Sequence, residues 1–246
     1  CHGSNRFSDD LNFAGSKSFA NVDLIKIKQC LEKYLGTRYG LEITVKEPKA
    51  LRNLPEYSEI KVDKWQVAIT TAPAQKDMAK QKIKIEVANI DAYTAQPKAL
   101  ILNYDGLPDG YANTLIQVES LNEIMADKLI SLANTTKYIR HRDIWDLVWL
   151  KQKRAVVDGE LVKQKIADYA IDNYLDKVAI IQNKLPDIVN SEPFQAEMQR
   201  FIAIDVQDRT LNKAGYNQYL SSEIIAMYEQ LKAQLNPDGK ESKFPM

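Results

Sequence analysis

Polar side chains occupy every second position of the segment RFSDDLNF, residues 6–13. Successive side chains of an extended strand point to opposite faces. Four polar residues would then share one face, namely Arg6, Ser8, Asp10 and Asn12. A cation, a hydroxyl, a carboxylate and an amide in one row could bind phosphate and a divalent cation. The other face is expected to pack on a core through Phe7, Leu11 and Phe13. A solvated edge strand would show the same alternation, so this segment alone leaves both interpretations open.

A second strand-like segment, KIKIEVANI at 82–90, could add a carboxylate to this row. Its alternation places Lys84 and Glu86 on one face. If this strand lies beside the opening one, Glu86 would join Asp10 and Asn12. Three oxygen-bearing side chains on adjacent strands can hold a hard cation such as Mg²⁺, together with water and phosphate oxygens. The alternative is a solvated Lys/Glu face on an antiparallel sheet.

Lys128 lies in the middle of an apolar helical stripe rather than opposite it. At 100° per residue the stripe consists of Leu121, Ile124, Met125 and Leu132. An inward-pointing lysine must either reach out to solvent or find an anion, such as a phosphate or a carboxylate in a cleft. The stripe does not decide between these two outcomes.

The segment HRDIWDLVWL, residues 141–150, predicts a helix that is apolar nearly all round and carries two carboxylates. Asp143 and Asp146 are three residues apart and therefore lie on one side of it. Carboxylates on a largely buried helix need partners, for which Arg140, Arg142 and Lys128 are candidates. An inward Lys and an inward Asp pair favour a polar site between sheet and helices, while a purely structural ion pair is the competing explanation.

The elements that must position these residues change character along the chain. Alternating, Ile- and Val-rich segments predict strands at 41–47, 64–70, 82–90 and 98–104. Apolar spacing predicts helices at 21–35, 121–133, 140–153, 159–182, 193–204 and 217–235. Ser120 and Glu123 match a capping box at the start of the second helix. The predicted class is α+β, a mixed and mostly antiparallel sheet with flanking helices in residues 1–118, followed by a helical region in residues 119–246.

Composition excludes several classes of protein. The chain has 246 residues, of which 45% are hydrophobic, so it can bury a sizeable core. The formal net charge is zero, which does not favour a general polyanion binder. Two cysteines and two histidines make neither a disulfide framework nor a zinc site. No apolar run reaches the roughly 18 residues of a membrane helix. We therefore expect a cytoplasmic protein without membrane contact.

Taken in order, these segments resemble the nucleotidyltransferase family of AbiEii/AbiGii abortive-infection toxins. Members of that family show R-x-S-x-D-L-D-F, then a K-x-E strand, then E-x-x-A-x-K-L and R-D-x-x-D-L on helices. The corresponding segments here are RFSDDLNF, KIEV, LNEIMADKLISL and RHRDIWDLVWL. The resemblance spans about residues 5 to 150, and it implies a nucleotidyltransferase-like sheet completed by helices.

The resemblance implies roles for particular residues. It assigns catalysis to Ser8, Asp10, Lys128 and Asp143. Nucleotide binding would fall to Arg6, Ser8 and Lys128, and metal binding to Asp10, Asn12 and Glu86. Relatives take a nucleoside triphosphate (NTP) with Mg²⁺ or Mn²⁺ and transfer a nucleotidyl group, in some cases to the acceptor end of tRNA. They act as toxins neutralised by a companion antitoxin.

Two departures from the family pattern bear on activity. Asn12 stands where the family has a second Asp, which removes one negative charge from the metal site. The glycine-rich phosphate cradle expected before Arg6 has no match in CHGSN, so we expect an N-terminally truncated or degenerate member. The first hypothesis is a metal-dependent nucleotidyltransferase of the toxin type. The alternatives are an impaired relative that binds nucleotide, RNA or an antitoxin, and a helical interaction protein without a site.

Overall fold

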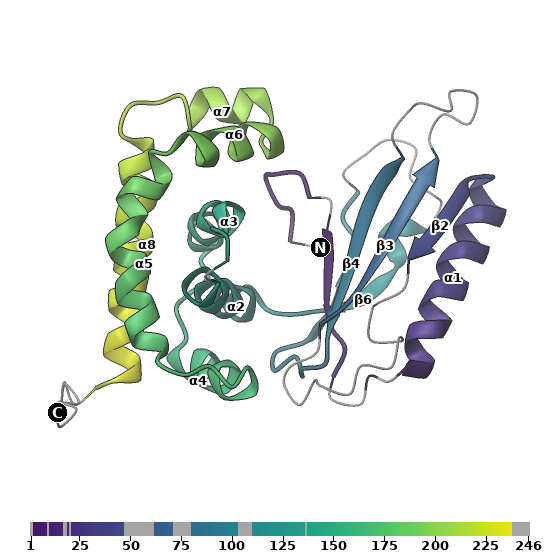
Figure 1. The fold of residues 1–246 in the computed structure, drawn as a ribbon, viewed down its shortest axis with the longest axis horizontal. Helices are drawn as coiled ribbons and strands as arrows, with labels where there is room; N and C mark the ends of the chain where they lie inside the picture. Colours follow the sequence, from purple (N-terminus) through teal and green to yellow (C-terminus); the bar gives the residue numbers. More distant parts are fainter. Residues whose placement is uncertain are drawn as a thin grey trace. The chain divides into compact units, whose positions relative to one another are not determined.

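The computed structural model divides into two compact units (Figure 1). The sheet unit is Ser8–Ala92, and the helical unit is Cys1–Phe7 together with Tyr93–Met246. The residues that the structure describes are 2–8, 10–16, 19, 21–46, 62–70, 80–102, 110–135 and 137–237. The sequence-based division at residue 118 stays a prediction.

The sheet unit contains a four-stranded sheet with the order β1-β4-β3-β2. Its elements are β1 (Asp10–Ala14), α1 (Asn21–Tyr39), β2 (Glu42–Lys46), β3 (Val62–Thr70) and β4 (Gln81–Ala88). β1 pairs with β4 in parallel, whereas β2–β3 and β3–β4 are antiparallel. The predicted mixed, mostly antiparallel sheet is therefore confirmed.

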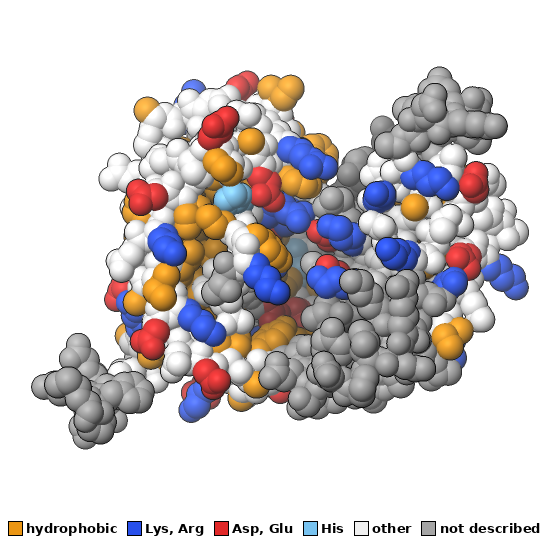
Figure 2. Space-filling model, in the orientation of Figure 1, with side chains coloured by type: hydrophobic (Ala, Val, Ile, Leu, Met, Phe, Trp, Pro, Cys, Tyr) orange, Lys and Arg blue, Asp and Glu red, His pale blue; other side chains and the backbone are white. Residues whose placement is uncertain are grey.

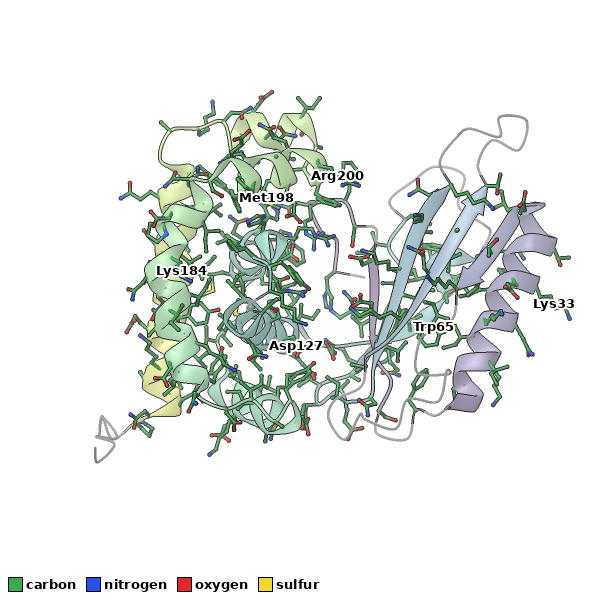
Figure 3. The ribbon with its side chains drawn as sticks, viewed as in Figure 1. Lys33, Trp65, Asp127, Lys184, Met198 and Arg200 are labelled. Carbon is green, nitrogen blue, oxygen red and sulfur yellow. The ribbon has the colours of Figure 1, made fainter. Side chains whose placement is uncertain are left out.

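Alternation along β3 and β4 produces the core of the sheet unit. Trp65, Val67, Ile85 and Val87 are buried on one face. Figure 3 shows Trp65 between the sheet and α1, where Phe19 meets its ring edge-on at 6.3 Å. The intervening side chains form the opposite face, which carries exposed lysines. The two faces follow directly from the period of two in these strands.

The opening segment differs from its prediction. The strand begins only at Asp10, and Leu11 and Phe13 are each 51% exposed. The prediction that these apolar residues pack on a core is wrong for a simple reason. β1 is an edge strand, and α1 packs against β2 at the opposite edge of the sheet.

The helical unit starts with a two-stranded antiparallel sheet and continues as a helical bundle. Its elements are β5 (Gln96–Ala99), the 3-10 helix η2 (Tyr111–Asn113), β6 (Leu115–Val118), α2 (Leu121–Asn134), α3 (His141–Gln152), α4 (Gly159–Asp168), α5 (Tyr174–Val189), α6 (Glu192–Phe201), α7 (Ile204–Arg209) and α8 (Tyr216–Leu235). α2 packs against α3, α4 and α5, which makes it the central helix (Figure 1). Within the described residues, no helix is both long and apolar enough to cross a membrane.

Three predicted boundaries are corrected by the structure. The strand predicted at 98–104 ends at Ala99; 100–102 are irregular, and 103–104 lie outside the described residues. The single helix predicted at 159–182 is two helices, α4 and α5, because Ala170 and Asn173 take left-handed conformations between them. The helix predicted at 193–204 ends at Phe201, and a separate short helix, α7, begins at Ile204.

The predicted cap of α2 is confirmed, but its partner has a different role. Ser120 Oγ accepts from the backbone N–H of Glu123 at 3.2 Å. The Glu123 carboxylate does not return the bond to Ser120, as a capping box would require. It accepts instead from the backbone N–H groups of Tyr93 (2.9 Å) and Thr94 (2.7 Å). The Glu123 carboxylate therefore anchors Tyr93 and Thr94, the residues that follow Ala92, to the start of α2.

A fully buried lysine joins α4 to α2. Lys165 Nζ lies 2.9 Å from carboxylate oxygens of both Glu123 and Asp127, and 3.9 Å from Glu119. Figure 3 labels Asp127, which extends from α2. Three carboxylates thus share one ammonium group. Burial, and then the neighbouring Asp127 carboxylate, raise the pKa of Glu119 to about 7.

This cluster predicts a pH-dependent stability. A carboxyl whose pKa is higher in the folded than in the unfolded state lowers the free energy of unfolding once it ionises. For Glu119 this loss develops as the pH rises from the ordinary pKa of about 4.5 through about 7. Replacing Glu119 by Gln should therefore raise Tm by roughly 5 °C at pH 8 and change it little at pH 5. The exposed Glu160→Gln variant is the matched control. Thermal unfolding followed by circular dichroism measures both, and an equal shift of Glu119→Gln at the two pH values would contradict the assignment.

Candidate functional site

The sequence-predicted site residues fall in both units. Arg6, Lys128 and Asp143 belong to the helical unit. Ser8, Asp10, Asn12 and Glu86 belong to the sheet unit.

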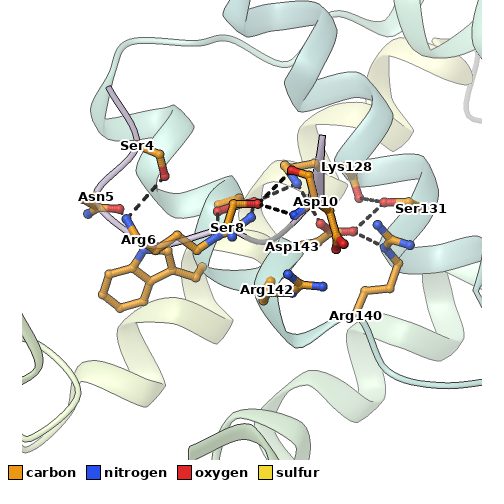
Figure 4. Close-up of polar contacts among 12 residues, drawn as sticks. Ser4, Asn5, Arg6, Ser8, Asp10, Lys128, Ser131, Arg140, Arg142 and Asp143 are labelled. Atoms are coloured by element: carbon orange, nitrogen blue, oxygen red, sulfur yellow. Dashed lines mark hydrogen bonds and ion pairs between the residues drawn. The ribbon is translucent and has the colours of Figure 1, made fainter. Parts of the chain in front are cut away.

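Lys128 is the centre of an ion network between α2 and α3 (Figure 4). Its Nζ donates to Asp143 Oδ1 at 2.8 Å and lies 2.7 Å from Asp146 Oδ2. The two carboxylates are one helical turn apart on α3, so both face the neighbouring helix. Their side chains are only 4% and 8% exposed. The inward lysine predicted from the apolar stripe has thus found anions within its own chain.

Asp143 is held from three sides. Ser131 Oγ donates to its Oδ2 at 2.7 Å, and the Arg140 guanidinium pairs with the same oxygen. Burial alone would raise the pKa of Asp143, but the charges of Lys128 and Arg140 outweigh it and lower the pKa to about 2. Burial likewise opposes the charge on Lys128, and the carboxylates of Asp143 and Asp146 outweigh burial and raise its pKa. Asp143 and Lys128 are therefore both ionised at neutral pH.

Arg6 completes the network from the N-terminal segment. Its Nε and Nη2 donate to the two oxygens of Asp146, each at 2.6 Å, in a bidentate arrangement. Its Nη1 donates to the carbonyl of Phe7 at 2.9 Å. Arg142, another candidate partner for these carboxylates, lies over the Phe201 ring and approaches Glu197 at 3.4 Å.

The sequence reasoning missed two supporting residues. Ser131 lies three positions after Lys128, so helical spacing could have placed it on the same face. Asn5 accepts a hydrogen bond from the indole N–H of Trp145 at 2.9 Å. Nothing in the sequence pairs Asn5 with a residue 140 positions away.

In the sheet unit, the pairing of β1 with β4 brings the predicted metal ligands together. Asn12 lies opposite Glu86 and Asp10 lies opposite Lys84, so their side chains share one face of the sheet. Ser8 Oγ donates to the Asp10 carbonyl at 3.1 Å. β1 and β4 thus lie side by side in the register that this site requires, and metal binding by Asp10, Asn12 and Glu86 stays a prediction.

Lysines accompany both carboxylates of this row. Lys84 Nζ lies 3.6 Å from Asp10 Oδ1, and Lys64 Nζ donates to Glu86 Oε1 at 2.9 Å. Figure 2 shows Lys and Arg side chains over the strands of the sheet unit. Each carboxylate of this row therefore has a lysine beside it.

The side-chain oxygens of this row are of the type that binds a hard divalent cation, although they are few. Two carboxylates and one amide on adjacent strands supply oxygen ligands of the type that Mg²⁺ prefers. Among the residues that the structure describes, no three Asp, Glu, His or Cys side chains gather as a metal site. Water and substrate phosphates would have to supply the remaining ligands, as is usual for Mg²⁺.

Removing Lys128 should destabilise the protein, because two buried carboxylates would lose a shared cation. We expect Lys128→Met to lower the free energy of unfolding by about 2–4 kcal/mol at pH 7. Lys177→Met is the matched control, since Lys177 Nζ donates to the neutral amide of Asn134. Its expected loss is below about 1 kcal/mol. Urea unfolding measures both, and equal losses would show that the network contributes no more than one neutral hydrogen bond.

Comparison with known proteins agrees with the resemblance drawn from the motifs. A family model described as nucleotidyl transferase AbiEii toxin, type IV toxin–antitoxin (TA) system, matches residues 1–222. Searches of curated proteins and of solved structures gave no match. The family match extends beyond the motif-bearing segments into α8. Because it covers most of the 246 residues, the chain belongs to the AbiEii family of nucleotidyl transferase toxins of type IV TA systems.

Proposed function

We propose that this chain is a metal-dependent nucleotidyltransferase that transfers a nucleotidyl group from an NTP to an acceptor. Family membership supports the reaction class. The observation that carries the proposal is Lys128, an ammonium group kept charged by two buried aspartates. Such a fixed cation is suited to a triphosphate, because this chemistry depends on positioning and charge stabilisation.

Three residues of the helical network have proposed roles in that reaction. Two hydrogens of the Lys128 ammonium group point to Asp143 and Asp146, which leaves one for a phosphate oxygen. Asp143 remains ionised and would orient or deprotonate the acceptor hydroxyl. Arg6 adds positive charge to the network through its pairing with Asp146.

The sheet residues have proposed roles in binding the metal and the nucleotide. Asp10, Asn12 and Glu86 would hold Mg²⁺ or Mn²⁺, and Ser8 would contact the nucleotide. The ion, when bound, supplies charge neutralisation between the triphosphate and the attacking hydroxyl. Lys64 and Lys84 would have to release Glu86 and Asp10 when the cation enters.

The acceptor and the partners are proposed from the family. A tRNA end would supply the acceptor hydroxyl, and a cognate antitoxin would neutralise the activity. An NTP substrate is consistent with the cytoplasmic location expected from the sequence.

The direct test is transfer of label from an α-³²P-labelled NTP to tRNA in the presence of Mg²⁺. Wild-type protein should label the RNA, whereas Asp10→Asn, Lys128→Gln and Asp143→Asn should reduce labelling by about 100-fold or more. Lys177→Gln is the matched control and should retain activity. NTP binding is measured alongside. Labelling that survives in all three site variants would refute the assignment.

A second candidate function rests on Asn12. An amide opposite Glu86, where the family has a carboxylate, leaves the metal site one charge short. A catalytically impaired relative would still bind nucleotide, RNA or an antitoxin. Nucleotide binding without transfer by the wild-type protein would favour this candidate.

The missing negative charge at position 12 predicts that a carboxylate introduced there will increase the affinity for the metal ion. Asn12→Asp should tighten Mn²⁺ binding by about tenfold, because a carboxylate is added within a few ångströms of the ion. Gln66→Glu adds the same charge to β3, two strands away from β1, and should have a smaller effect. Electron paramagnetic resonance of free Mn²⁺ measures both affinities. Equal tightening by the two variants would mean that general charge, rather than a ligand at position 12, determines binding.

A further inference from the structure

We propose that Arg6 and Asp146 are a positioning pair, which clamps the N-terminal segment to the helical unit and orients Lys128 without touching the nucleotide. This inference rests on the proposed function. It differs from the sequence-based role of Arg6, which placed its guanidinium on the nucleotide.

The guanidinium of Arg6 is already committed. Its Nε and Nη2 occupy both oxygens of Asp146, and its Nη1 donates to the Phe7 carbonyl. The paired side chains are only 11% and 8% exposed. A phosphate could bind the guanidinium of Arg6 only if the Asp146 carboxylate lost these two hydrogen bonds. Leaving a buried carboxylate without its partner is costly.

Asp146 links this clamp to Lys128. Its Oδ2 accepts from Arg6 and lies 2.7 Å from Lys128 Nζ, so one oxygen contacts both cations. Asp143 takes a second hydrogen of the ammonium group. Lys128 is thus oriented by two fixed carboxylates. An ammonium group on a flexible stem needs such fixing to present its remaining hydrogen in one direction.

Further contacts show that the whole segment is docked, not the arginine alone. Asn5 accepts from the indole N–H of Trp145, and the Phe7 N–H donates to the Phe201 carbonyl at 2.8 Å. His2 Nε2 bonds the carbonyl of Glu119 at 2.9 Å. These anchors lie immediately before the point where the chain passes to Ser8 and Asp10. Loosening them would free the N-terminal segment from the helical unit and remove one of the two carboxylates that orient Lys128.

The test is a double-mutant cycle on transfer, using the full chain. Arg6→Gln and Asp146→Asn should each slow single-turnover transfer at saturating NTP by about 10- to 100-fold, since small misplacements of reacting groups have effects of this size. The double variant should be no slower than the slower single variant. The Kd for the NTP should change by less than about threefold throughout, as expected for misplacement rather than a lost contact. Arg209→Gln and Asp205→Asn disrupt an exposed Arg–Asp pair of the same chemistry and should leave the rate unchanged.

A second measurement is independent of activity. Trypsin cleavage after Arg6 reports release of the segment, so Asp146→Asn should speed that cleavage at least about tenfold. Asp205→Asn should leave it unchanged. If wild-type protein transfers no label, the proposed function fails and this measurement still decides on the clamp.

Two outcomes would overturn the inference. One is a transfer rate within twofold of wild type for both single variants, with unchanged cleavage after Arg6. The other is a rise in the NTP Kd of more than tenfold for Arg6→Gln alone, which would return Arg6 to direct phosphate binding.

Discussion

Ionised side chains in the core of a helical bundle need partners, because desolvation of an unpaired charge is costly. The central helix α2 meets this requirement twice. It extends Lys128 to Asp143 and Asp146 of α3, and its Glu123 and Asp127 receive Lys165 of α4. Both sets of ion pairs cross between helices, so they fix the neighbours of α2 by geometry as well as by packing. The first set also holds the residues proposed for chemistry.

The two sets of ion pairs also secure the points where the chain passes from one unit to the other. Asp146 holds Arg6 just before Ser8, and Glu123 holds the backbone of Tyr93 and Thr94 just after Ala92. Each crossing is therefore tied to a buried carboxylate that a lysine also contacts. The charges that stabilise the bundle therefore also hold the ends of the helical unit's chain segments at both crossings.

Much of the fold follows from local patterns, and the rest requires contacts that are distant in sequence. Alternation predicts β2, β3 and β4, and the cap at Ser120 is visible in the sequence. The burial of Lys165 also had a signal, because it lies four residues after the buried Leu161 on the same face of α4. The break between α4 and α5 had no such signal in the sequence, because it depends on residues other than glycine that take left-handed conformations. The pairing of Asp146 with Arg6 spans 140 positions, and no spacing rule reaches that far.

The proposal that most needs a test is that Lys128 binds a triphosphate and that Asp10 binds the metal ion. A crystal structure with Mn²⁺ and a non-hydrolysable NTP analogue tests it directly, because Mn²⁺ can be located by its anomalous scattering. We expect an ion bound by Asp10, with Asn12 or Glu86 beside it, and a triphosphate oxygen within hydrogen-bond distance of Lys128 Nζ. A nucleotide bound away from Lys128, or an ion without Asp10 among its ligands, would contradict it.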